Sequence, residues 1–411
     1  MTAPNTADLE PVDDFRDRAR RWLRAILPPA PPEPAGESGK SEASWSRARQ
    51  LQRILYDGGF AGICFPRQYG GLGLTPEHQR AFSEESRGFE MPLALNIPTL
   101  TICAATILDR GTEAQKRDHL PAVLRGEELL VQFLSEPRGG SDLAGLTTRA
   151  ERRGENWVLN GAKIWSSGAY AADYALCLAR TDWDVPKHAG LTMFLVPVHA
   201  PGITIRRITQ VDGSREFCQE FLDDVVLPGD AVLGEVNGGW EVTNRQLFHE
   251  RSAVGGASPY ASGAQTHSGR DVSALVDIAR RTGQFDDPRV REDIGAARAM
   301  NMVHDQLIAR ITRGIASGDL PPAAGSIVRL FSAQNSWLQA DTALRVAGPW
   351  AATGPDGSGR AGQDYLMRQA WSLAGGSTEM ARNIISERVL GMPREAAPDR
   401  DVPFNRVERG R

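Results

Sequence analysis

The spacing of the apolar residues changes twice along this chain, and these changes limit the folds that it can adopt. Before Glu128 apolar residues recur every three or four positions, as in amphipathic helices. From there to Gly238 they form short β-branched or apolar runs that Gly, Pro or Asp separate, and the helical spacing then returns. The expected strands are 131–134, 157–159, 174–179, 192–197, 203–207 and 216–227. The sequence therefore predicts an α+β multidomain fold, with an N-terminal α-helical domain over 1–128, a middle antiparallel β-barrel or sandwich domain over 129–236 and a C-terminal helical domain over 237–411.

The N-terminal part contains one segment to which we assign no secondary structure. Residues 28–44 are rich in Pro, Gly and Ser, which is typical of a linker or a mobile loop. The predicted helices around it are 12–27, 45–58, 75–89, 93–109 and 112–125.

Composition excludes several functional classes. With 411 residues the chain is long enough for two or three domains, and its net charge of -4 gives no basic surface for nucleic acid. No run approaches the length of a membrane span, and the N-terminus lacks the apolar region of a signal peptide. The four cysteines are widely separated and include no CxxC pair. We therefore expect reduced thiols in a cytoplasmic protein and no metal site.

Two motifs in the middle segment combine residue types that suit a flat, redox-active ring. The first is Phe133-Leu-Ser-Glu-Pro-Arg-Gly-Gly-Ser-Asp142, and about twenty residues later Lys163-Ile-Trp-Ser-Ser167 follows. Short hydroxyl side chains and backbone amides can polarise ring heteroatoms, while a Trp forms a wall against one face. Either motif alone is as consistent with an ordinary turn or with a core aromatic residue; together they favour a flavin site.

The order and spacing of these motifs, together with Gly375-Gly-Ser-Thr-Glu-Met-Ala-Arg-Asn-Ile-Ile-Ser-Glu-Arg388, resemble those of the acyl-CoA dehydrogenase family of FAD flavoproteins. The resemblance runs over nearly the whole chain. It implies FAD as cofactor and a four-helix bundle as the C-terminal domain. The flavin-binding positions that it implies in the middle segment are Phe133, Ser135, Gly140, Ser141, Trp165 and Ser167.

The family needs a carboxylate to take the α-proton of the acyl thioester, and its members place that Glu at one of two sequence positions. One of these positions is Gly375 in this chain, which can offer only its backbone. The other is Glu250, in Leu247-Phe-His-Glu-Arg-Ser252, an arrangement similar to that of isovaleryl- and long-chain dehydrogenases. Helical spacing also puts Glu250 on a stripe with Trp240, Thr243, Leu247 and Val254, where burial would raise its pKa. The alternative is a Glu at a helix edge that pairs with Arg245 or Arg251.

The resemblance also implies substrate contacts and cofactor contacts across a subunit interface. Substrate contacts are expected at Ser141, Phe248, Arg251 and Gly375, whereas His249 is expected to pack. Arg280 matches an Arg that reaches the FAD pyrophosphate of a neighbouring protomer. Further cofactor positions are Gly348, Ser377 and Glu379. Gly283 and Pro349 depart from the family pattern near the expected adenosine half of FAD.

These features predict an acyl-CoA dehydrogenase that forms a trans-2-enoyl thioester and passes its electrons to an electron-transfer flavoprotein. A homodimer or homotetramer is expected, and a heteromer with Glu250 in the catalytic subunit remains open. Two other functions are compatible with the same fold, namely a flavin monooxygenase or oxidase and a non-catalytic partner subunit. The acyl chain stays open, as does acyl carrier protein in place of CoA.

Overall fold

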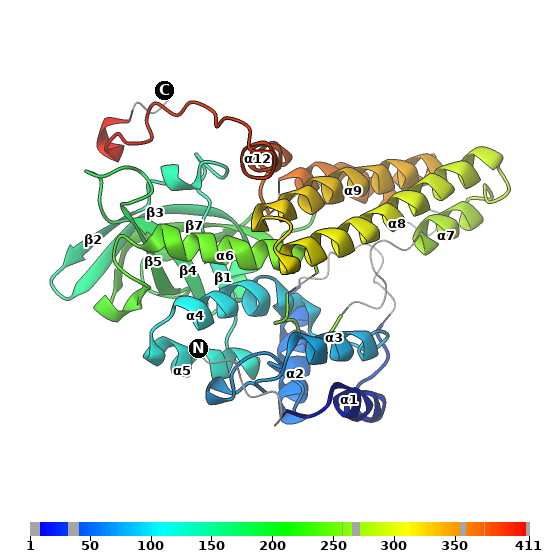
Figure 1. The fold of residues 1–411 in the computed structure, drawn as a ribbon, viewed down its shortest axis with the longest axis horizontal. Coiled ribbons are helices and arrows are strands. Elements are labelled where there is room, and N and C mark those ends of the chain that lie inside the picture. Colours follow the sequence, from blue (N-terminus) through cyan, green and yellow to red (C-terminus); the bar gives the residue numbers. More distant parts are fainter. Residues whose placement is uncertain are drawn as a thin grey trace.

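The computed structural model describes residues 9–31, 41–256, 258–264, 272–353, 359–373 and 375–407. Helices form the first part of the chain, a β-sheet the middle and helices the last part (Figure 1). This arrangement confirms the predicted fold class. Among the described residues no helix is long and apolar enough to cross a membrane.

Short helices make up the N-terminal part. Their bounds are α1 Val12–Ile26, α2 Glu42–Asp57, α3 Pro76–Glu85, the π-helical segment Asn96–Ala104, α4 Ala105–Arg110 and α5 Glu113–Leu124. Helix α1 buries Phe15, Ala19 and Leu23 on one stripe. Of the predicted loop 28–44, residues 32–40 lie outside the described residues. Helix α2 begins earlier than predicted, because the Ser41 side chain accepts a hydrogen bond from the backbone of Ser44 and caps it.

The middle part is one eight-stranded sheet, in the order β6-β7-β3-β2-β4-β5-β8 with β1 paired to β4 in parallel. The strands are β1 Leu130–Phe133, β2 Arg149–Arg153, β3 Asn156–Ser167, β4 Tyr174–Arg180, β5 Leu191–Pro197, β6 Ile203–Arg207, β7 Phe217–Leu227 and β8 Val232–Leu233. Strand β3 is far longer than predicted. It carries the Trp165 motif, because its pairing with β7 runs from Trp157 to Ser167.

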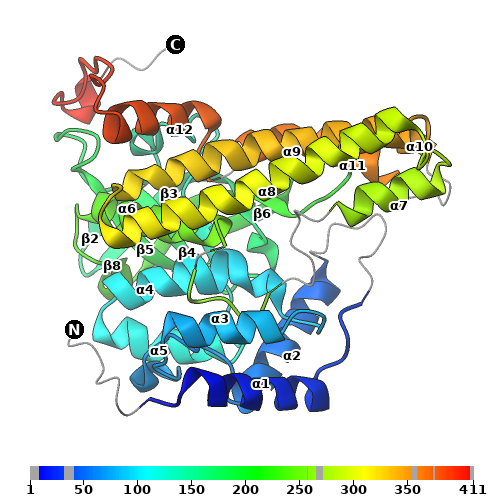
Figure 2. The ribbon, with the colours of Figure 1, turned by 45° about the vertical axis from the view of Figure 1, so that its right-hand side comes forward.

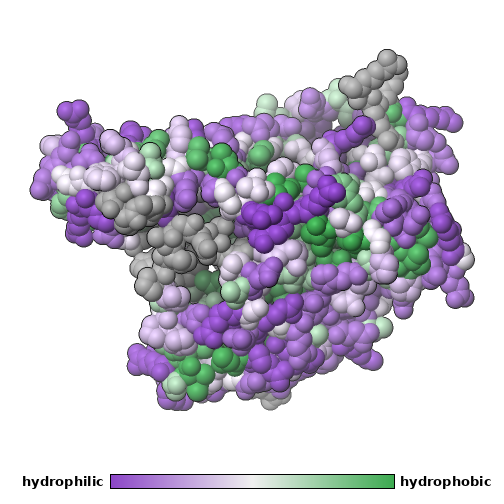
Figure 3. All heavy atoms as spheres, turned by 180° about the vertical axis from the view of Figure 1, so that it is seen from behind, coloured by the Kyte–Doolittle hydropathy of each residue, from purple (hydrophilic) through white to green (hydrophobic). Residues whose placement is uncertain are grey.

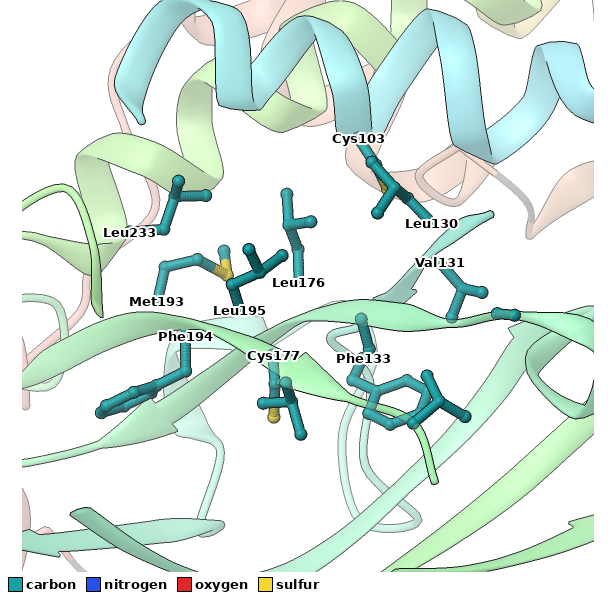
Figure 4. Packing of buried hydrophobic residues seen from close by; sticks show 14 of the residues in the cluster. Cys103, Leu130, Val131, Phe133, Leu176, Cys177, Met193, Phe194, Leu195 and Leu233 are labelled. Carbon is teal, nitrogen blue, oxygen red and sulfur yellow. The ribbon is translucent and has the colours of Figure 1, made fainter. Parts of the chain in front are cut away.

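Apolar side chains cover both faces of this sheet. Figure 4 shows Leu176 and Met193 pointing towards the helices, whereas Cys177 and Phe194 point to the opposite face. All four residues are fully buried. Because neighbouring residues of a strand point to opposite faces, β4 and β5 each pack against the layer of helices on one side and against a second apolar layer on the other.

The C-terminal part contains two long helices that pack along each other, α8 Pro288–Ser317 and α9 Gly325–Ala347 (Figure 2). The other helices are α6 Gly239–Val254, α7 Ser273–Arg281, α10 Trp350–Thr353, α11 Arg360–Met367 and α12 Thr378–Ile384. Helices α7, α11 and α12 pack on α9. Helix α6 lies against the π-helical segment, α4 and β5, and this contact places the expected base beside the sheet.

Candidate active site

Glu250 lies near the end of α6 and is held by a residue of the sheet. The Gln132 side chain on β1 donates a hydrogen bond from Nε2 to Glu250 Oε2 at 3.0 Å. Phe133 points away from the helices (Figure 4). Because side chains alternate along a strand, its neighbour Gln132 lies on the helix side. The bond therefore ties the carboxylate to the strand that leads into the Ser135–Ser141 turn.

The surroundings of Glu250 favour its protonated form, but cations oppose this. Burial raises the pKa of Glu250, while the Gln132 hydrogen bond and the charges of Arg251 and Arg329 act to lower it. A carboxylate whose pKa is raised is a stronger base than an ordinary carboxylate once it is ionised. This is the property that a general base needs.

Gly375 lies directly against this carboxylate. A Cβ atom built on Gly375 would lie 3.7 Å from Glu250 Oε1, 3.5 Å from Arg329 Nε and 3.8 Å from Val254 Cγ2. Arg329 on α9 donates from Nη2 to the carbonyl of Trp371 at 2.8 Å, so it also fixes the chain before Gly375. Two distant parts of the sequence thus meet at one carboxyl group.

The buried stripe of α6 differs from the predicted one. It consists of Gly239, Val242, Thr243, Gln246 and His249, whereas Val254 is 49% exposed and Glu250 lies at the stripe's edge. His249 Nε2 lies 2.7 Å from Asp109 Oδ2, and Arg245 contacts the same carboxylate. Arg245 is therefore engaged by Asp109, and His249 packs as expected.

The turn after β1 rests on a buried ion pair. Lys163 Nζ lies 3.0 Å from Glu136 Oε1 and also donates to the carbonyl of Leu134 at 3.0 Å. Burial alone would raise the pKa of Glu136, but Lys163 and the donors of Thr147 and Thr148 outweigh it and lower the pKa to about 2. These contacts fix both motifs to each other.

The two sequence motifs meet beside this pair. The backbone N–H of Ile164 donates to the carbonyl of Ser135 at 3.0 Å. Ser135 and Ser167 are partly exposed and Gly140 and Ser141 are exposed, so their polar groups remain accessible. Phe133 differs, because its ring is fully buried in the core. Its expected cofactor contact therefore cannot come from the ring in this chain.

Trp165 occupies an unusual backbone position. It has φ 67°, at the point where the β3–β7 register shifts between Ile164 and Ser166. A bulge of this kind re-aims a side chain, and backbone strain gathers at functional sites. The indole is 55% exposed and rests edge-on against Phe217, with ring centroids 5.9 Å apart. An exposed aromatic face next to accessible hydroxyls and amides fits one side of a flavin ring.

The remaining predicted cofactor residues lie elsewhere in the chain. Helix α7, which carries Arg280, packs on α9, which Gly348 follows, and α7 lies at the end of the helical bundle far from the sheet (Figure 1). Gln284 Nε2 links the two segments through the Val346 carbonyl at 2.6 Å. An Arg280 that contacts FAD would therefore have to do so in another protomer.

The other predicted contact residues lie on α12 and on α6. Ser377 caps α12, where its side chain accepts a hydrogen bond from the backbone N–H of Met380, and Glu379 is exposed two residues later.

On α6, Phe248 is 41% exposed beneath Arg245 and does not share the face of Glu250. Arg251 adjoins Glu250 and interacts with its charge. Figure 3 shows hydrophobic side chains gathered below the bundle on an otherwise mostly hydrophilic face.

Sequence reasoning missed Gln132, Arg329 and the Glu136–Lys163 pair. A signal existed for Gln132, since it is the single polar residue in the apolar run Leu130–Phe133. Glu136 and Lys163 stood inside the two motifs. Nothing in the local pattern of α9 marks Arg329, because its partners come from segments far away in the sequence.

Known proteins resemble this chain over most of its length. Profiles of the acyl-CoA dehydrogenase N-terminal, middle and C-terminal domains match residues 10–127, 132–225 and 237–390. Acyl-CoA dehydrogenase IpdE1 of Mycobacterium tuberculosis is 35% identical over 397 residues, which cover 94% of this chain and 100% of that protein. The mitochondrial isovaleryl-CoA dehydrogenase of Pongo abelii is 30% identical over 263 residues, which cover 60% of this chain and 61% of that protein.

Solved structures give the same result. The Tcur3481-Tcur3483 steroid ACAD superposes with a TM-score of 0.74 at 28% identity, covering 94% of this chain and 99% of that one. A chain of the ChsE4-ChsE5 complex from Mycobacterium tuberculosis superposes with a TM-score of 0.71 at 26% identity, covering the same shares, 94% and 99%.

Proposed function

The chain belongs to the acyl-CoA dehydrogenase family, and we propose that it converts an acyl-CoA thioester to the trans-2-enoyl-CoA with FAD as cofactor and Glu250 as base. The observation that carries this proposal is the Gln132–Glu250 hydrogen bond of 3.0 Å. It joins a carboxyl group of raised pKa to the strand that leads into the Ser135–Ser141 turn. A base held against the strand that leads into a ring-binding turn is the arrangement that α,β-dehydrogenation requires.

The residues beside Glu250 have distinct roles in the proposed reaction. Glu250 takes the α-proton, and Gln132 orients the carboxylate that accepts it. The charges of Arg251 and Arg329 favour the ionised form of Glu250, against the effect of its burial. The backbone N–H of Gly375 polarises the thioester carbonyl, so the α-proton becomes more acidic.

The cofactor would be held by the turn and by β3. Backbone amides of the turn and the hydroxyls of Ser135, Ser141 and Ser167 would bind its polar atoms, while Trp165 would cover one face of its ring and exclude water. When bound, FAD supplies the acceptor for the hydride that leaves the β-carbon. Ser377, Glu379, Arg280 and Gly348 would complete the site, the last two from a neighbouring protomer. The proposed site therefore needs an oligomer.

The names of the relatives suggest a substrate and partners. Similarity to a steroid ACAD supports a bulky, ring-containing acyl group in preference to a straight short chain. Similarity to a complex of two different chains, ChsE4 and ChsE5, supports a heteromer with this chain as the subunit that supplies the base. We propose a cytoplasmic protein that passes its electrons to an electron-transfer flavoprotein.

A spectroscopic experiment tests the function. Purified wild type and Glu250→Gln would be mixed anaerobically with a panel of acyl-CoA thioesters, and the visible flavin spectrum would be followed. We expect bleaching in the wild type and at least a thousandfold slower bleaching in the variant. Glu241→Gln is the matched control, because Glu241 lies on the same helix and is exposed beside Arg110 at 2.8 Å.

Three results would contradict the proposal. A protein without flavin absorbance would point to a non-catalytic subunit. Bound flavin that never bleaches would point to oxygen chemistry. Equal bleaching in wild type and Glu250→Gln would remove Glu250 as the base.

A further inference from the structure

Arg180, at the end of β4, is fully buried and binds the segment that follows the Ser135–Ser141 turn. Its guanidinium donates from Nη2 to the Ala144 carbonyl at 2.6 Å and from Nε to the Leu146 carbonyl at 3.2 Å. Nη1 donates to the Lys187 carbonyl at 3.2 Å. One planar group thus fixes two separate backbone segments, for which the fork of an arginine is well suited.

A residue from the C-terminal segment 399–407 covers this guanidinium. The ring centroid of Phe404 lies 3.5 Å from Arg180 Cζ, and Phe404 is itself 2% exposed. A cation over an aromatic face is stabilised most where water is excluded, as it is here. The segment is anchored by its backbone, because Phe404 N donates to the Val185 carbonyl at 2.9 Å and Asn405 N donates to the Trp183 carbonyl at 3.0 Å.

Lys187 makes a second connection between the same segments. Its Nζ lies 3.1 Å from Asp142 Oδ1 and 3.7 Å from Asp399 Oδ2. Exposed ion pairs contribute little singly, but this one joins the last residue of the first sequence motif to the C-terminal segment. Lys187 therefore links the end of the first motif to the C-terminal segment at the surface, as Arg180 does in the core.

The Ser135–Ser141 turn is anchored differently at its two ends. Its first end is held within the sheet, and its second end is held by the Arg180 and Lys187 contacts. Glu136 is fixed by Lys163 and by the donors of Thr147 and Thr148. Beyond it, Pro137, Arg138, Gly140 and Ser141 are exposed, and the chain is fixed again at Asp142 and at the two carbonyls that Arg180 binds. The second end of the turn is therefore held by contacts that the C-terminal segment covers.

We propose that the C-terminal segment 399–407 is a structural part of the cofactor site, with Arg180 and Lys187 as positioning residues that hold the Ser135–Ser141 turn in its binding conformation. This inference rests on the proposed flavin function, since it assigns the turn to FAD. Without Phe404 the guanidinium of Arg180 is opened to water and its bonds to Ala144 and Leu146 weaken. The turn then loses order before the rest of the fold does.

Two disruptive substitutions and one conservative one test the proposal without removing the buried cation. Phe404→Ala removes the covering ring, Lys187→Met removes the surface bridge, and Phe404→Trp keeps an aromatic face. Arg207→Ala is the matched control, because Arg207 lies 3.9 Å above the Tyr170 ring at the β6 edge of the same sheet. The dissociation constant of FAD would be measured by fluorescence titration of the apoprotein. Trypsin cleavage after the exposed Arg138 would be followed by mass spectrometry without cofactor.

We expect Phe404→Ala to weaken FAD binding about fivefold or more and to accelerate cleavage after Arg138 by a similar factor. Lys187→Met should act in the same direction with a smaller effect, and Phe404→Trp and Arg207→Ala should resemble the wild type. Unchanged FAD affinity and cleavage in both Phe404→Ala and Lys187→Met would overturn the inference. If Phe404→Ala does not fold, Lys187→Met decides alone. A wild type that binds no FAD would refute the proposed function, whereas the cleavage comparison would still test the link between segment and turn.

Discussion

Gly375 lies against Glu250, so that a Cβ atom at position 375 would lie 3.7 Å from Glu250 Oε1. The family resemblance implies that the base can come from either of these two positions. In the structure the two positions adjoin each other, so a carboxylate from either one would reach nearly the same place. In the proposed reaction, Gly375 would leave room for the carboxylate of Glu250 and for the substrate.

Gly375→Ala should impair catalysis more than folding. Its φ of 71° is strained for a residue with a side chain, which costs about 1 kcal/mol, and its methyl group would stand between Arg329 and the Glu250 carboxylate. We expect kcat/KM to fall about tenfold while flavin remains bound. Gly376→Ala is the control, because φ is 93° there but a Cβ would meet no atom within 4 Å. Equal losses of activity in both variants would show that backbone strain, and not the methyl group, is responsible.

Gln132→Leu should shift the pH profile of the reaction. Gln132 donates a hydrogen bond that stabilises the ionised form of Glu250, so its loss raises the pKa of Glu250 further above the usual range. The base must be ionised to act, and the acidic limb of kcat/KM should therefore move to higher pH. Rates of flavin bleaching between pH 5 and 9 would measure this shift. A lower rate with an unmoved limb would mean that Gln132 only positions the substrate.

Much of the architecture could be predicted from the sequence, because helices and strands leave different apolar spacings. Strand β2 escaped detection because Arg149–Arg153 is almost entirely polar and exposed, so it has no apolar alternation. Strand β3 was predicted too short, since Gly161 and the bulge at Trp165 interrupt its pattern although pairing with β7 continues. The spacing of apolar residues in the sequence cannot reveal a strand that is stabilised mainly by backbone pairing with neighbouring strands.

The candidate site was predictable only where a motif marks it. Local sequence and family resemblance predict Glu250, Trp165 and the Ser135–Ser141 turn as site residues. They do not predict Gln132 and Arg329, because the importance of these two residues comes from tertiary contacts with Glu250 and Gly375. The stripe on α6 was misplaced for a related reason, since its buried face is set by β5, α4 and the segment Asn96–Ala104.

Glu136→Gln should destabilise the protein strongly. The substitution leaves the buried Lys163 without its counter-charge, which costs about 3–5 kcal/mol. The pKa of Glu136 is lowered to about 2, so its stabilising contribution is present above pH 4.5 and is lost as the pH falls towards 2. Thermal unfolding at pH 7 would measure the effect. Asp57→Asn, which breaks the exposed Arg53–Asp57 pair, is the control and should change stability by about 0.5 kcal/mol or less. Similar melting temperatures for Glu136→Gln and wild type would contradict the assigned role of the pair.

Glu220→Gln should stabilise the protein, and increasingly so as pH rises. Burial raises the pKa of Glu220 to about 8, although Ser166 Oγ bonds its Oε2 at 3.0 Å. The folded state therefore keeps a proton that the unfolded state releases above about pH 4.5, so this residue destabilises the fold progressively between about pH 4.5 and 8. A Gln is neutral throughout and avoids the loss, which reaches about 5 kcal/mol at most.

Melting temperatures of wild type and Glu220→Gln between pH 4.5 and 8.5 would measure this dependence. The two should coincide at the acidic end and separate as pH rises, with the variant the more stable. Taking the difference at each pH removes the titration of all shared groups. Glu155→Gln, at an exposed turn, is the control and should follow the wild type throughout. A constant difference between Glu220→Gln and wild type at every pH would mean that Glu220 is ionised in the fold. Its buried Oε1, which has no hydrogen-bond partner, would then need a cation to balance it.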